Sequence, residues 1–488
     1  MKTEKNTIAL TRKGFLAGLL SSGAAAGCRS VPWIGGPAPR LRLGVVSDTH
    51  ITTQESTEMF RRSLAYFRKR GADAVLVAGD LTDWGLLSSL RFVKEAWDDE
   101  MGGTGIVPLF VTGNHDFDGW WYGDMTLDMH IQGFSEDEAL VGRGMKGCWE
   151  EVFGEPYDAV RRRTVKGFDF VSAEWGPGAE SNKAQTVAWL SAHAGGFPKD
   201  RPVFFMRHAP LPETVSSSPR NSRDPVVTEA LKGLPNCFAF TGHTHWTLND
   251  ERSIWQDSGL TAISVPSLSY TSIPRGYENG YEKRDGKCAH GMGIIPSRLN
   301  LIEAQGFFVS VYDGETVVER YDFEECEEAA DPWVVPMPPA AGRPYAFSEH
   351  AKRVPVPEFP GGAAVKTRIE NSDRRNGTWT IFVALEFPAA RASGGGRVFD
   401  YEVRAVSENG APAVSKKFLS PAFYRLARHE PETMRFRFDA MDLPESGRYR
   451  FEVVARNCFG AESAPLYSRY FQSVPGKDKA KRIAGRGG

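Results

Sequence analysis

The sequence predicts an α/β layered domain followed by an all-β sandwich domain. From Leu41 to about Phe323, apolar runs typical of buried strands alternate with segments of helical periodicity. From about Gly361 to Val474, short segments of alternating polarity follow one another without helical periodicity. With 488 residues, the chain is long enough for two or three domains and a large core.

The first domain, residues 41–323, is predicted from a repeated order of strand, helix and strand. Its opening run, LRLGVVSD, is typical of a buried strand. The next segment carries Phe60, Leu64 and Phe67 at helical spacing and ends at Gly71. The same criteria predict strands at 73–80, 105–114, 168–174, 202–208 and 237–243, and helices at 86–100 and 182–196.

A change of composition separates this domain from the second one. Residues 324–360 are first acidic and then rich in proline, which is typical of a linker. Residues 361–474 contain TWTIFVALEF, VFDYEVRAV, MRFRFDAM and YRFEVVARN, which predict a β-sandwich. The run SGRYRFEVVARNCFGAESAP resembles the late strands of a fibronectin type III or similar immunoglobulin-like domain. The basic tail, residues 475–488, is expected to be disordered.

Residues 1–28 are predicted to be an export signal, with a linker at 29–40. A basic start precedes an apolar run that is too short to span a bilayer. TRKGFLAG resembles the twin-arginine export motif, with Lys13 in place of the second arginine, and AAGC resembles a lipoprotein box ending at Cys28. A lipidated Cys28 would attach an exported, periplasmic or cell-envelope protein to the membrane. Plain cleavage, with Cys28 incidental, is the alternative.

Net charge and cysteine content argue against several classes of protein. A net charge of -2 gives no electrostatic case for nucleic-acid binding. The remaining cysteines are scattered, without a C-x-x-C pair, which argues against a zinc ribbon and a dense disulfide framework. They are Cys148, Cys237, Cys288, Cys326 and Cys458. Buried free thiols are favoured over one or two disulfides.

Polar residues follow five of the predicted strands. The blocks are VVSDTH (Asp48, His50), VAGDLTD (Asp80, Asp83), VTGNHD (Asn114, His115, Asp116), FFMRHAP (His208) and TGHTH (His243, His245). Because open α/β sheets bind ligands just beyond the carboxyl ends of their strands, these side chains should gather at one rim. Gly79, Gly113 and Gly242 would let the backbone turn sharply there.

The residue types in these blocks indicate a metal site. Imidazole, carboxylate and amide oxygen together suit Mn, Fe, Zn or Co. One such block is more often a turn than a ligand set, but five in order behind buried strands favour ligands. His243 and His245 would point to opposite faces of a continuous strand. Gly242 marks the end of that strand, so strict alternation no longer governs the two histidines.

The ordered series Asp-x-His, Gly-Asp-x-x-Asp, Gly-Asn-His-Asp, a lone His and Gly-His-x-His resembles the calcineurin-like metallophosphoesterase superfamily. The resemblance covers residues 41 to about 323 and implies a two-sheet α/β sandwich flanked by helices, with two metal ions between strand ends. It assigns one metal to Asp48, His50 and His245, the other to Asn114, His208 and His243, and the bridge between them to Asp80.

The same resemblance implies a hydrolytic mechanism. A metal-bridging hydroxide would attack phosphorus in line, without a covalent enzyme intermediate. His115 would lie beside the leaving-group oxygen and donate a proton, and Asp83 would orient His115 and keep it protonated. A purely structural role is the alternative for His115. For Asp116, a turn or a supporting hydrogen bond is favoured.

Departures from known branches narrow the class. Trp84 stands where serine/threonine protein phosphatases carry arginine. Thr82 and Asp83 leave no place for the tyrosine ligand of purple acid phosphatases. GDLTDWG and GNHD look more like the branch that contains class III cyclic-nucleotide phosphodiesterases and related periplasmic hydrolases. An exported enzyme would rarely meet cyclic nucleotides, so that substrate is not adopted.

The sequence therefore predicts an exported, dinuclear-metal phosphoesterase that hydrolyses phosphate mono- or diesters. Trp120 and Trp121 would stack on a base or sugar, with packing as the alternative. Arg275 would bind a phosphate, but loop arginines are usually solvated, and that alternative is favoured. A phosphodiesterase specific for nucleotides or lipid headgroups is an alternative function. In a third hypothesis, a cell-surface protein binds through the sandwich and the catalytic fold is inert; the complete ligand set counts against it. The pattern does not indicate an oligomeric state.

Overall fold

The computed structural model describes most of the chain outside its two ends. The described residues are 38–117, 144–176, 179–219, 225–274, 277–278, 292–294, 304–338, 343–371, 381–410, 412–443 and 447–472. The predicted export signal with Cys28, the candidate substrate residues Trp120, Trp121 and Arg275, and the basic tail lie outside these ranges. Residues 37–488 form one compact unit. Within the described ranges, no helix is long and apolar enough to cross a membrane.

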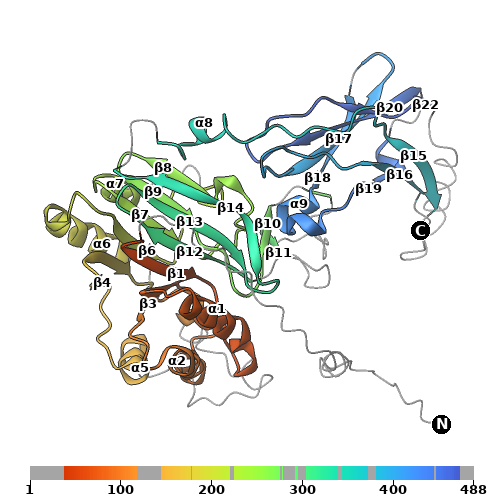
Figure 1. Cartoon of the computed structure of the whole chain (residues 1–488). Coiled ribbons are helices and arrows are strands. Elements are labelled where there is room, and N and C mark those ends of the chain that lie inside the picture. Colours follow the sequence, from red (N-terminus) through yellow and green to blue (C-terminus); the bar gives the residue numbers. More distant parts are fainter. Residues whose placement is uncertain are drawn as a thin grey trace, which may run out of the picture. The chain divides into compact units, whose positions relative to one another are not determined.

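The first of two large sheets has six strands in the order β14-β13-β12-β1-β2-β3 (Figure 1). Their bounds are β1 Leu41–Val46, β2 Ala74–Ala78, β3 Val107–Val111, β12 Gln305–Val311, β13 Glu315–Asp322 and β14 Glu327–Pro336. β1, β2 and β3 run parallel, with Leu43 opposite Ala74 and Ala74 opposite Val107. The other three strands are joined antiparallel. Because β1, β2 and β3 are parallel, their carboxyl ends meet at one edge of the sheet.

The second sheet has the order β4-β5-β6-β7-β9-β8. Its strands are β4 Val160–Val165, β5 Phe168–Ala173, β6 Val203–Arg207, β7 Cys237–Thr241, β8 Ile254–Asp257 and β9 Leu260–Ser264. The central strands β5, β6, β7 and β9 are parallel, and the two outer strands are antiparallel to their neighbours. This sheet too brings the carboxyl ends of its central strands to one edge.

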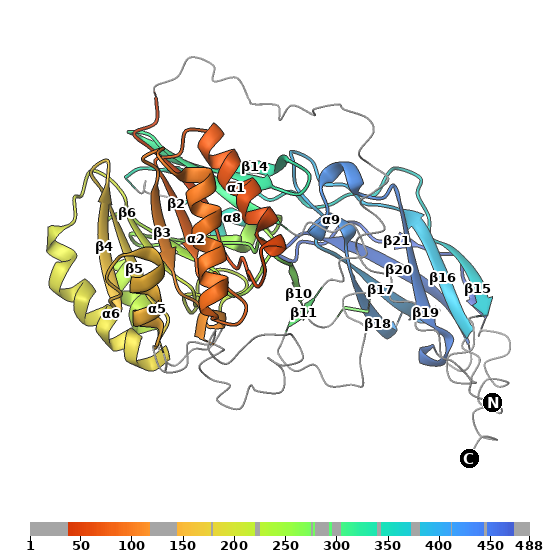
Figure 2. The ribbon, with the colours of Figure 1, turned by 90° about the horizontal axis from the view of Figure 1, so that it is seen from below.

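The two sheets pack face to face and helices cover their outer faces (Figures 1 and 2). In β2, Leu76 lies in the core between the sheets, whereas Val75 and Val77 face the helices. α1 Glu58–Lys69, α2 Leu87–Met101 and α5 Gly144–Phe153 cover the first sheet, and α6 Ala179–His193 and α7 Val226–Lys232 cover the second. Both faces are thus buried, which explains why these strands are apolar throughout. The predicted two-sheet α/β fold is confirmed.

β14 lies inside the segment whose composition predicts a linker. Residues 327–336 pair antiparallel with β13 and extend the first sheet past residue 323. Ala329, Trp333 and Val335 are buried against that sheet, which offsets the unfavourable acidic and proline content of the segment. The composition therefore gave the wrong structure for residues 327–336.

The C-terminal part is built from antiparallel sheets, as predicted. One has the order β15-β16-β19 and the other β18-β17-β20-β21, with β22 also paired to β20. Their bounds are β15 Lys366–Asn371, β16 Ile381–Pro388, β17 Asp400–Ser407, β18 Pro412–Leu419, β19 Thr433–Asp439, β20 Arg448–Arg456, β21 Leu466–Tyr467 and β22 Phe471–Gln472. Alternate residues of both sheets, such as Phe436 and Val453, share one core. We call this part the sandwich.

Short elements complete the described chain. They include α8 Phe347–His350, α9 Pro421–Tyr424, the two-stranded sheet of β10 Ser272–Pro274 and β11 Met292–Ile294, and several single turns of 3-10 helix. Among the cysteines, Cys237 and Cys458 are buried free thiols.

Candidate metal centre

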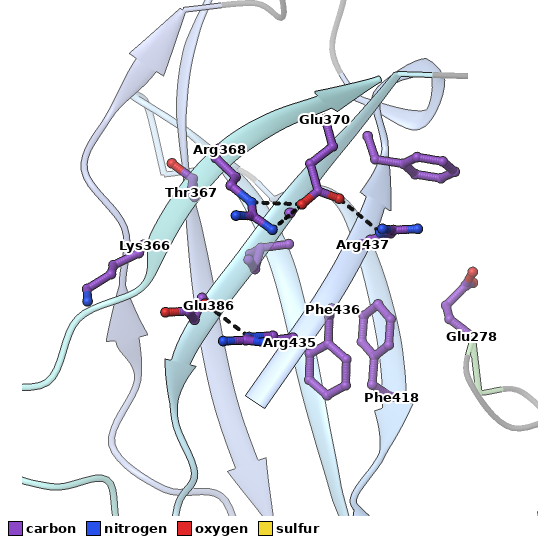
Figure 3. Close-up of a pocket in the computed structure, with 13 residues that line it drawn as sticks. Glu278, Lys366, Thr367, Arg368, Glu370, Glu386, Phe418, Arg435, Phe436 and Arg437 are labelled. Carbon is purple, nitrogen blue, oxygen red and sulfur yellow. Dashed lines mark hydrogen bonds and ion pairs between the residues drawn. The ribbon is translucent and has the colours of Figure 1, made fainter. Parts of the chain in front are cut away.

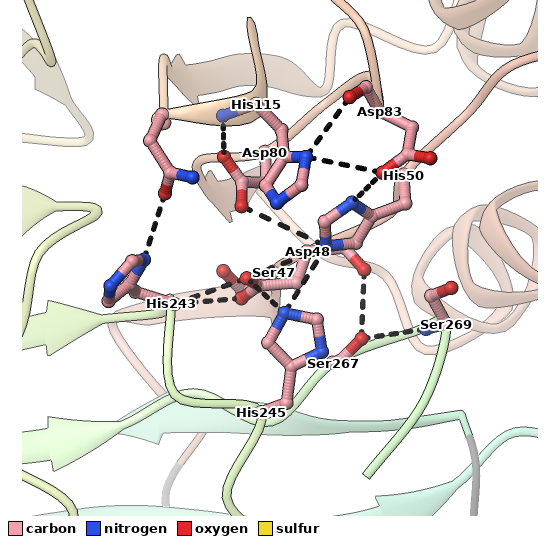
Figure 4. Close-up of polar contacts among 12 residues, drawn as sticks. Ser47, Asp48, His50, Asp80, Asp83, His115, His243, His245, Ser267 and Ser269 are labelled. Atoms are coloured by element: carbon pink, nitrogen blue, oxygen red, sulfur yellow. Dashed lines mark hydrogen bonds and ion pairs between the residues drawn. The ribbon is translucent and has the colours of Figure 1, made fainter. Parts of the chain in front are cut away.

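The predicted ligand blocks converge where strand ends of the two sheets meet (Figure 4). Asp48 follows β1, Asp80 follows β2 and Asn114 follows β3, while His208 follows β6 and the two histidines of the Gly-His-x-His block follow β7. Backbone hydrogen bonds join these ends, from Asp48 N to Gly79 O at 2.9 Å and from Gly242 N to His208 O at 3.0 Å. The rim predicted from the sequence therefore exists.

One group of donor atoms comes from Asp48, His50, Asp80 and His245, all of which are buried. Their ligand atoms lie within 4.8 Å of one another. His245 Nε2 is 3.0 Å from Asp48 Oδ1 and 3.2 Å from His50 Nε2. His50 Nε2 is in turn 3.8 Å from Asp80 Oδ2. Carboxylate oxygens and imidazole nitrogens facing one point form a suitable cation site.

A second group comes from Asp80, His208 and His243, again within 4.8 Å. His208 Nε2 is 3.0 Å from Asp80 Oδ2 and 3.2 Å from Asn114 Oδ1. His243 Nδ1 is 2.8 Å from the same Asn114 oxygen. Asp80 belongs to both groups, which is the arrangement that a bridging carboxylate needs.

Three of the histidines use their other ring nitrogen to fix their orientation. His50 Nδ1–H donates to Asp83 Oδ1 at 2.8 Å, His208 Nδ1–H to Ala78 O at 2.8 Å, and His245 Nδ1–H to Tyr270 O at 3.1 Å. Each bond leaves Nε2 as the nitrogen that faces the carboxylates. Metal-binding histidines are held in this way, so the residues present fit a metal pair.

The backbone at these strand ends adopts the left-handed region. φ is +52° at Asp48, +46° at His50, +49° at Asp80, +71° at His243 and +49° at His245. Each such residue costs roughly 1–3 kcal/mol unless its surroundings hold it there. The conformation ends the strand alternation, and His243 and His245 therefore reach different donor groups although only Thr244 separates them.

The glycines of the blocks provide space as well as a turn. Gly79 has φ +95°, as expected for a turn, but no positive φ occurs at Gly113 or Gly242. A Cβ at Gly242 would overlap Ser47 Oγ and lie 2.6 Å from Asp48 Oδ2. A Cβ at Gly113 would overlap Asp80 Oδ1. The sharp turn predicted for Gly113 and Gly242 therefore does not explain why these positions carry glycine. Glycine is needed there because a carboxylate approaches the backbone closely.

The electrostatics favour charged groups at the centre. Burial alone would raise the pKa of Asp48 and of Asp80, but the neighbouring histidines outweigh it and lower both. Burial would lower the pKa of His208, yet the charges of Asp80 and Asp48 raise it to about 9. Within the described ranges, all side-chain ion-pair partners of the two carboxylates are histidines. A bound cation would displace their protons and neutralise the carboxylates instead.

His115 and Asp83 lie next to the first donor group. His115 Nδ1–H is 3.0 Å from Asp83 O and 3.2 Å from Asp83 Oδ1, and about a third of each side chain is exposed. His115 N also donates to Asp80 Oδ1 at 2.9 Å. Burial would raise the pKa of Asp83, but hydrogen bonds from His115 and His50 lower it. Asp83 thus contacts the predicted acid, and it also orients a predicted ligand, which the sequence did not show.

Asp116 holds the loops in place. Its carboxylate accepts hydrogen bonds from the backbone N–H groups of Leu81, Thr82 and Gly113 at 2.8–3.2 Å, and from the Thr82 hydroxyl at 2.9 Å. Burial and the charge of Asp80 raise its pKa to about 6. The structure is consistent with the predicted supporting role.

Two aromatic residues that the sequence did not single out flank the centre. The Tyr270 ring lies 4.0 Å from that of His245, and the Trp175 ring is stacked 5.9 Å from that of His243. Ser267 Oγ also donates to Asp48 O at 2.9 Å. These residues come from loops without a motif, so no pattern in the sequence could identify them.

A cavity of about 760 Å³ lies elsewhere, on the outer face of β15, β16 and β19 (Figure 3). Its lining includes Arg435, paired with Glu386 at 3.1 Å, and Arg437, paired with Glu370 at 3.0 Å. These arginines already have carboxylate partners, and the cavity contains none of the predicted metal ligands, which lie at the strand ends.

The fold and its donor groups define a metal-binding hydrolase. Residues 41–247 match the family described as calcineurin-like phosphoesterase and form a calcineurin-like metallophosphoesterase domain. The protein is therefore a metal-dependent phosphoester hydrolase. The match ends before the sandwich, so the likeness of the sandwich to a fibronectin type III domain stays a prediction. No curated protein matches the chain.

Several solved structures are similar to the chain. A dimetal phosphatase from Danio rerio is 12% identical, with 61% of this chain and 99% of that chain covered and a TM-score of 0.37. Purple acid phosphatase PPD1 from yellow lupin (Lupinus luteus) is 13% identical, covering 61% and 55%, with a TM-score of 0.36. An archaeal phosphodiesterase is 11% identical, covering 61% and 100%, with a TM-score of 0.24. These likenesses are too distant to indicate a substrate.

Proposed function

We propose that this protein is an exported phosphoesterase that binds two metal ions and hydrolyses phosphate mono- or diesters. The observation that carries the proposal is the pair of donor groups that share Asp80. Two cations a few ångströms apart repel each other, and a shared carboxylate reduces that repulsion. Mn, Fe, Zn and Co all suit the mixture of imidazole, carboxylate and amide donors.

The ligand assignment follows the two groups. Asp48, His50 and His245 would hold one ion and Asn114, His208 and His243 the other, with Asp80 between them. When bound, the metals would supply an activated water and neutralise charge on the phosphoryl oxygens. His243 N also donates to both oxygens of Asp48 at 3.1 Å, which keeps that carboxylate in place.

His115 would protonate the leaving-group oxygen. Its side chain is partly exposed at the edge of the first donor group, and its Nδ1 lies 3.0 Å from Asp83 O and 3.2 Å from Asp83 Oδ1. The Asp83 carboxylate would stabilise the protonated ring while a substrate is bound. Deprotonation of His115 during turnover would supply the proton that an alkoxide leaving group needs.

Export and membrane attachment belong to the same proposal. The basic start, the TRKGFLAG motif and the AAGC box support secretion and lipidation at Cys28. A phosphodiesterase that prefers nucleotides or lipid headgroups would show itself as a preference for diesters in a substrate screen.

Hydrolysis of p-nitrophenyl phosphate and bis-p-nitrophenyl phosphate by the metal-loaded full chain tests the proposal. His245→Ala is expected to lower kcat at least roughly a hundredfold while circular dichroism stays unchanged, because a direct ligand is lost. His429→Ala is the matched control, because this histidine is 39% exposed in the sandwich and outside the site. Equal turnover by wild type and His245→Ala, or no turnover of either ester by wild type, would refute the proposal.

A further inference from the structure

The residue that follows the ligand His245 is anchored in the sandwich. Trp246 is buried, and its ring packs edge-on against Phe423 of α9 with 5.6 Å between centroids. Leu419, at the end of β18, completes this apolar cluster. The backbone of His245 is thus continuous with a side chain whose packing partners belong to the C-terminal part.

Hydrogen bonds fix the same loop a few residues later. The buried Asn249 side chain donates to Phe423 O at 3.2 Å and to Arg425 O at 3.4 Å. Trp246 Nε1 donates to Asp250 Oδ2 at 2.9 Å, which closes the loop on itself. The short α9 element is therefore held by both an apolar contact and two hydrogen bonds.

A second connection runs through the segment that supports His245 from the other side. Tyr270 O accepts from His245 Nδ1–H, and Ser272 N donates to His245 O at 2.8 Å. Beyond β10, Glu278 N donates to Lys417 O of β18 at 2.9 Å, and Tyr277 Oη donates to Asp400 Oδ2 of β17 at 2.8 Å. Both segments that contact His245 are thus attached to the sandwich.

The other donor group is held differently. The contacts described for His208 and Asn114 are with residues such as Ala78 and His243, which belong to the catalytic part, that is, the two large sheets with their helices and loops. His245 has φ +49° and His243 has φ +71°, conformations that persist only where the surroundings impose them. The hydrogen bonds described for His243 are with Asp48 and Asn114, whereas the support of His245 includes the sandwich. Loss of its external support should therefore release His245 and leave His208 in place.

We propose that the sandwich is a positioning element of the metal centre: through Phe423 and Asn249 it holds His245 against Asp48 and His50, and thereby sets the metal affinity of that group alone. The inference rests on the proposed function, because it concerns the metal pair. It gives the sandwich a role in the active site that an independent binding module would not have.

Cobalt titration of the full chain, followed by the visible absorption of bound Co²⁺, tests this role. Wild type is expected to bind two ions. Phe423→Ala should bind the ion of the His208 group with unchanged affinity. It should bind the ion of the His245 group roughly 10–100-fold more weakly, the usual effect of losing a ligand's support. Phe423→Leu should restore most of that affinity, because it refills the apolar contact.

Phe438→Ala is the matched control. Phe438 is fully buried in the sandwich core but lies outside the Trp246 cluster, so this variant loses stability without loosening His245. Titrations are made below the unfolding transitions of both variants, and Phe438→Ala is expected to bind cobalt like wild type. Asn249→Ala leaves the apolar cluster of Trp246 and Phe423 intact and should lower the affinity for the ion of the His245 group alone. This variant provides a test if Phe423→Ala does not fold.

The outcomes separate this inference from the proposed function. Two-site binding with unchanged affinities in Phe423→Ala and Asn249→Ala would overturn the inference and leave the proposed function standing. Equal weakening in Phe423→Ala and Phe438→Ala would also overturn it, because general destabilisation would then suffice. A wild-type chain that binds no cobalt would overturn the proposed function and this inference together.

Discussion

Asp83 serves two histidines with one carboxylate. It accepts from His50 Nδ1–H at 2.8 Å, which points His50 Nε2 at the donor group, and it lies 3.2 Å from His115 Nδ1. A single residue therefore couples the predicted metal ligand His50 to the proposed proton donor His115. Such supporting carboxylates control both the orientation of the imidazole and its basicity.

Substitution of Asp83 should affect metal binding and turnover together. Asp83→Ala is expected to lower the metal affinity of the group that contains His50 roughly 10–100-fold, because His50 loses its orienting partner. It should also lower kcat at saturating metal, because His115 loses the carboxylate that favours its protonated form. Metal titration and steady-state kinetics measure the two effects. Normal kcat at saturating metal would contradict the role assigned to His115.

At the scale of single residues, the sequence indicated the predicted ligands but not the residues that pack against them and their loops. The gathering of the predicted ligands at one rim could be predicted, because their blocks end apolar strands and parallel strands bring such ends together. Trp175, Tyr270 and Phe423 could not, because only the folded chain brings the first two beside His243 and His245 and the third against Trp246.

Strand ends are the elements that build this centre. The residue pairs of β1 with β2 and of β2 with β3 place Asp48, Asp80 and Asn114 at neighbouring positions. At Gly113 and Gly242, the carboxylates of Asp80 and Asp48 occupy the space that a Cβ would need, so only glycine fits there. The apolar patterns predicted these strands well, whereas β14 was missed because its acidic and proline-rich composition hides alternate burial.

A methyl group at one strand end should therefore disturb the metal centre. Gly242→Ala would force its Cβ into Ser47 and Asp48, so we expect the chain to fold but to lose metal affinity by at least roughly tenfold. Gly314→Ala is the control, because a Cβ there meets nothing within 4 Å. Metal titration of both variants checks this. Wild-type affinity in Gly242→Ala would show that the close approach is not required.

For the whole molecule, burial of charged groups makes stability depend on pH. Asp322, at the end of β13, is fully buried, and its Oδ2 has no hydrogen-bond partner among the described residues. Burial, together with the charges of Glu324 and Glu325, raises its pKa from the usual 3.8 to about 7, although the Glu325 N–H opposes the shift. The folded chain therefore keeps a proton that the unfolded chain releases. Its stability contribution is present below about pH 4 and is lost as pH rises towards about 7.

Asp322→Asn removes this titration. The variant is expected to melt at a higher temperature than wild type at pH 8, with a smaller difference near pH 4. Thermal unfolding followed by circular dichroism at both pH values measures it. The same difference in melting temperature at pH 4 and pH 8 would contradict a buried, proton-binding Asp322.

The two domain types could be predicted from periodicity, but their connection could not. Sequence patterns describe each apolar face separately, and they do not say which faces meet. Only the packed chain shows that Trp246 of the catalytic part and Phe423 of the sandwich share a cluster.

Metal content of the reconstituted full chain tests the central claim most directly. With Mn, Fe, Zn or Co, wild type should retain two ions per chain after removal of excess metal. Asp80→Ala should retain fewer than one, because Asp80 belongs to both donor groups. Two ions in Asp80→Ala, or no more than one in wild type, would contradict a metal pair bridged by Asp80.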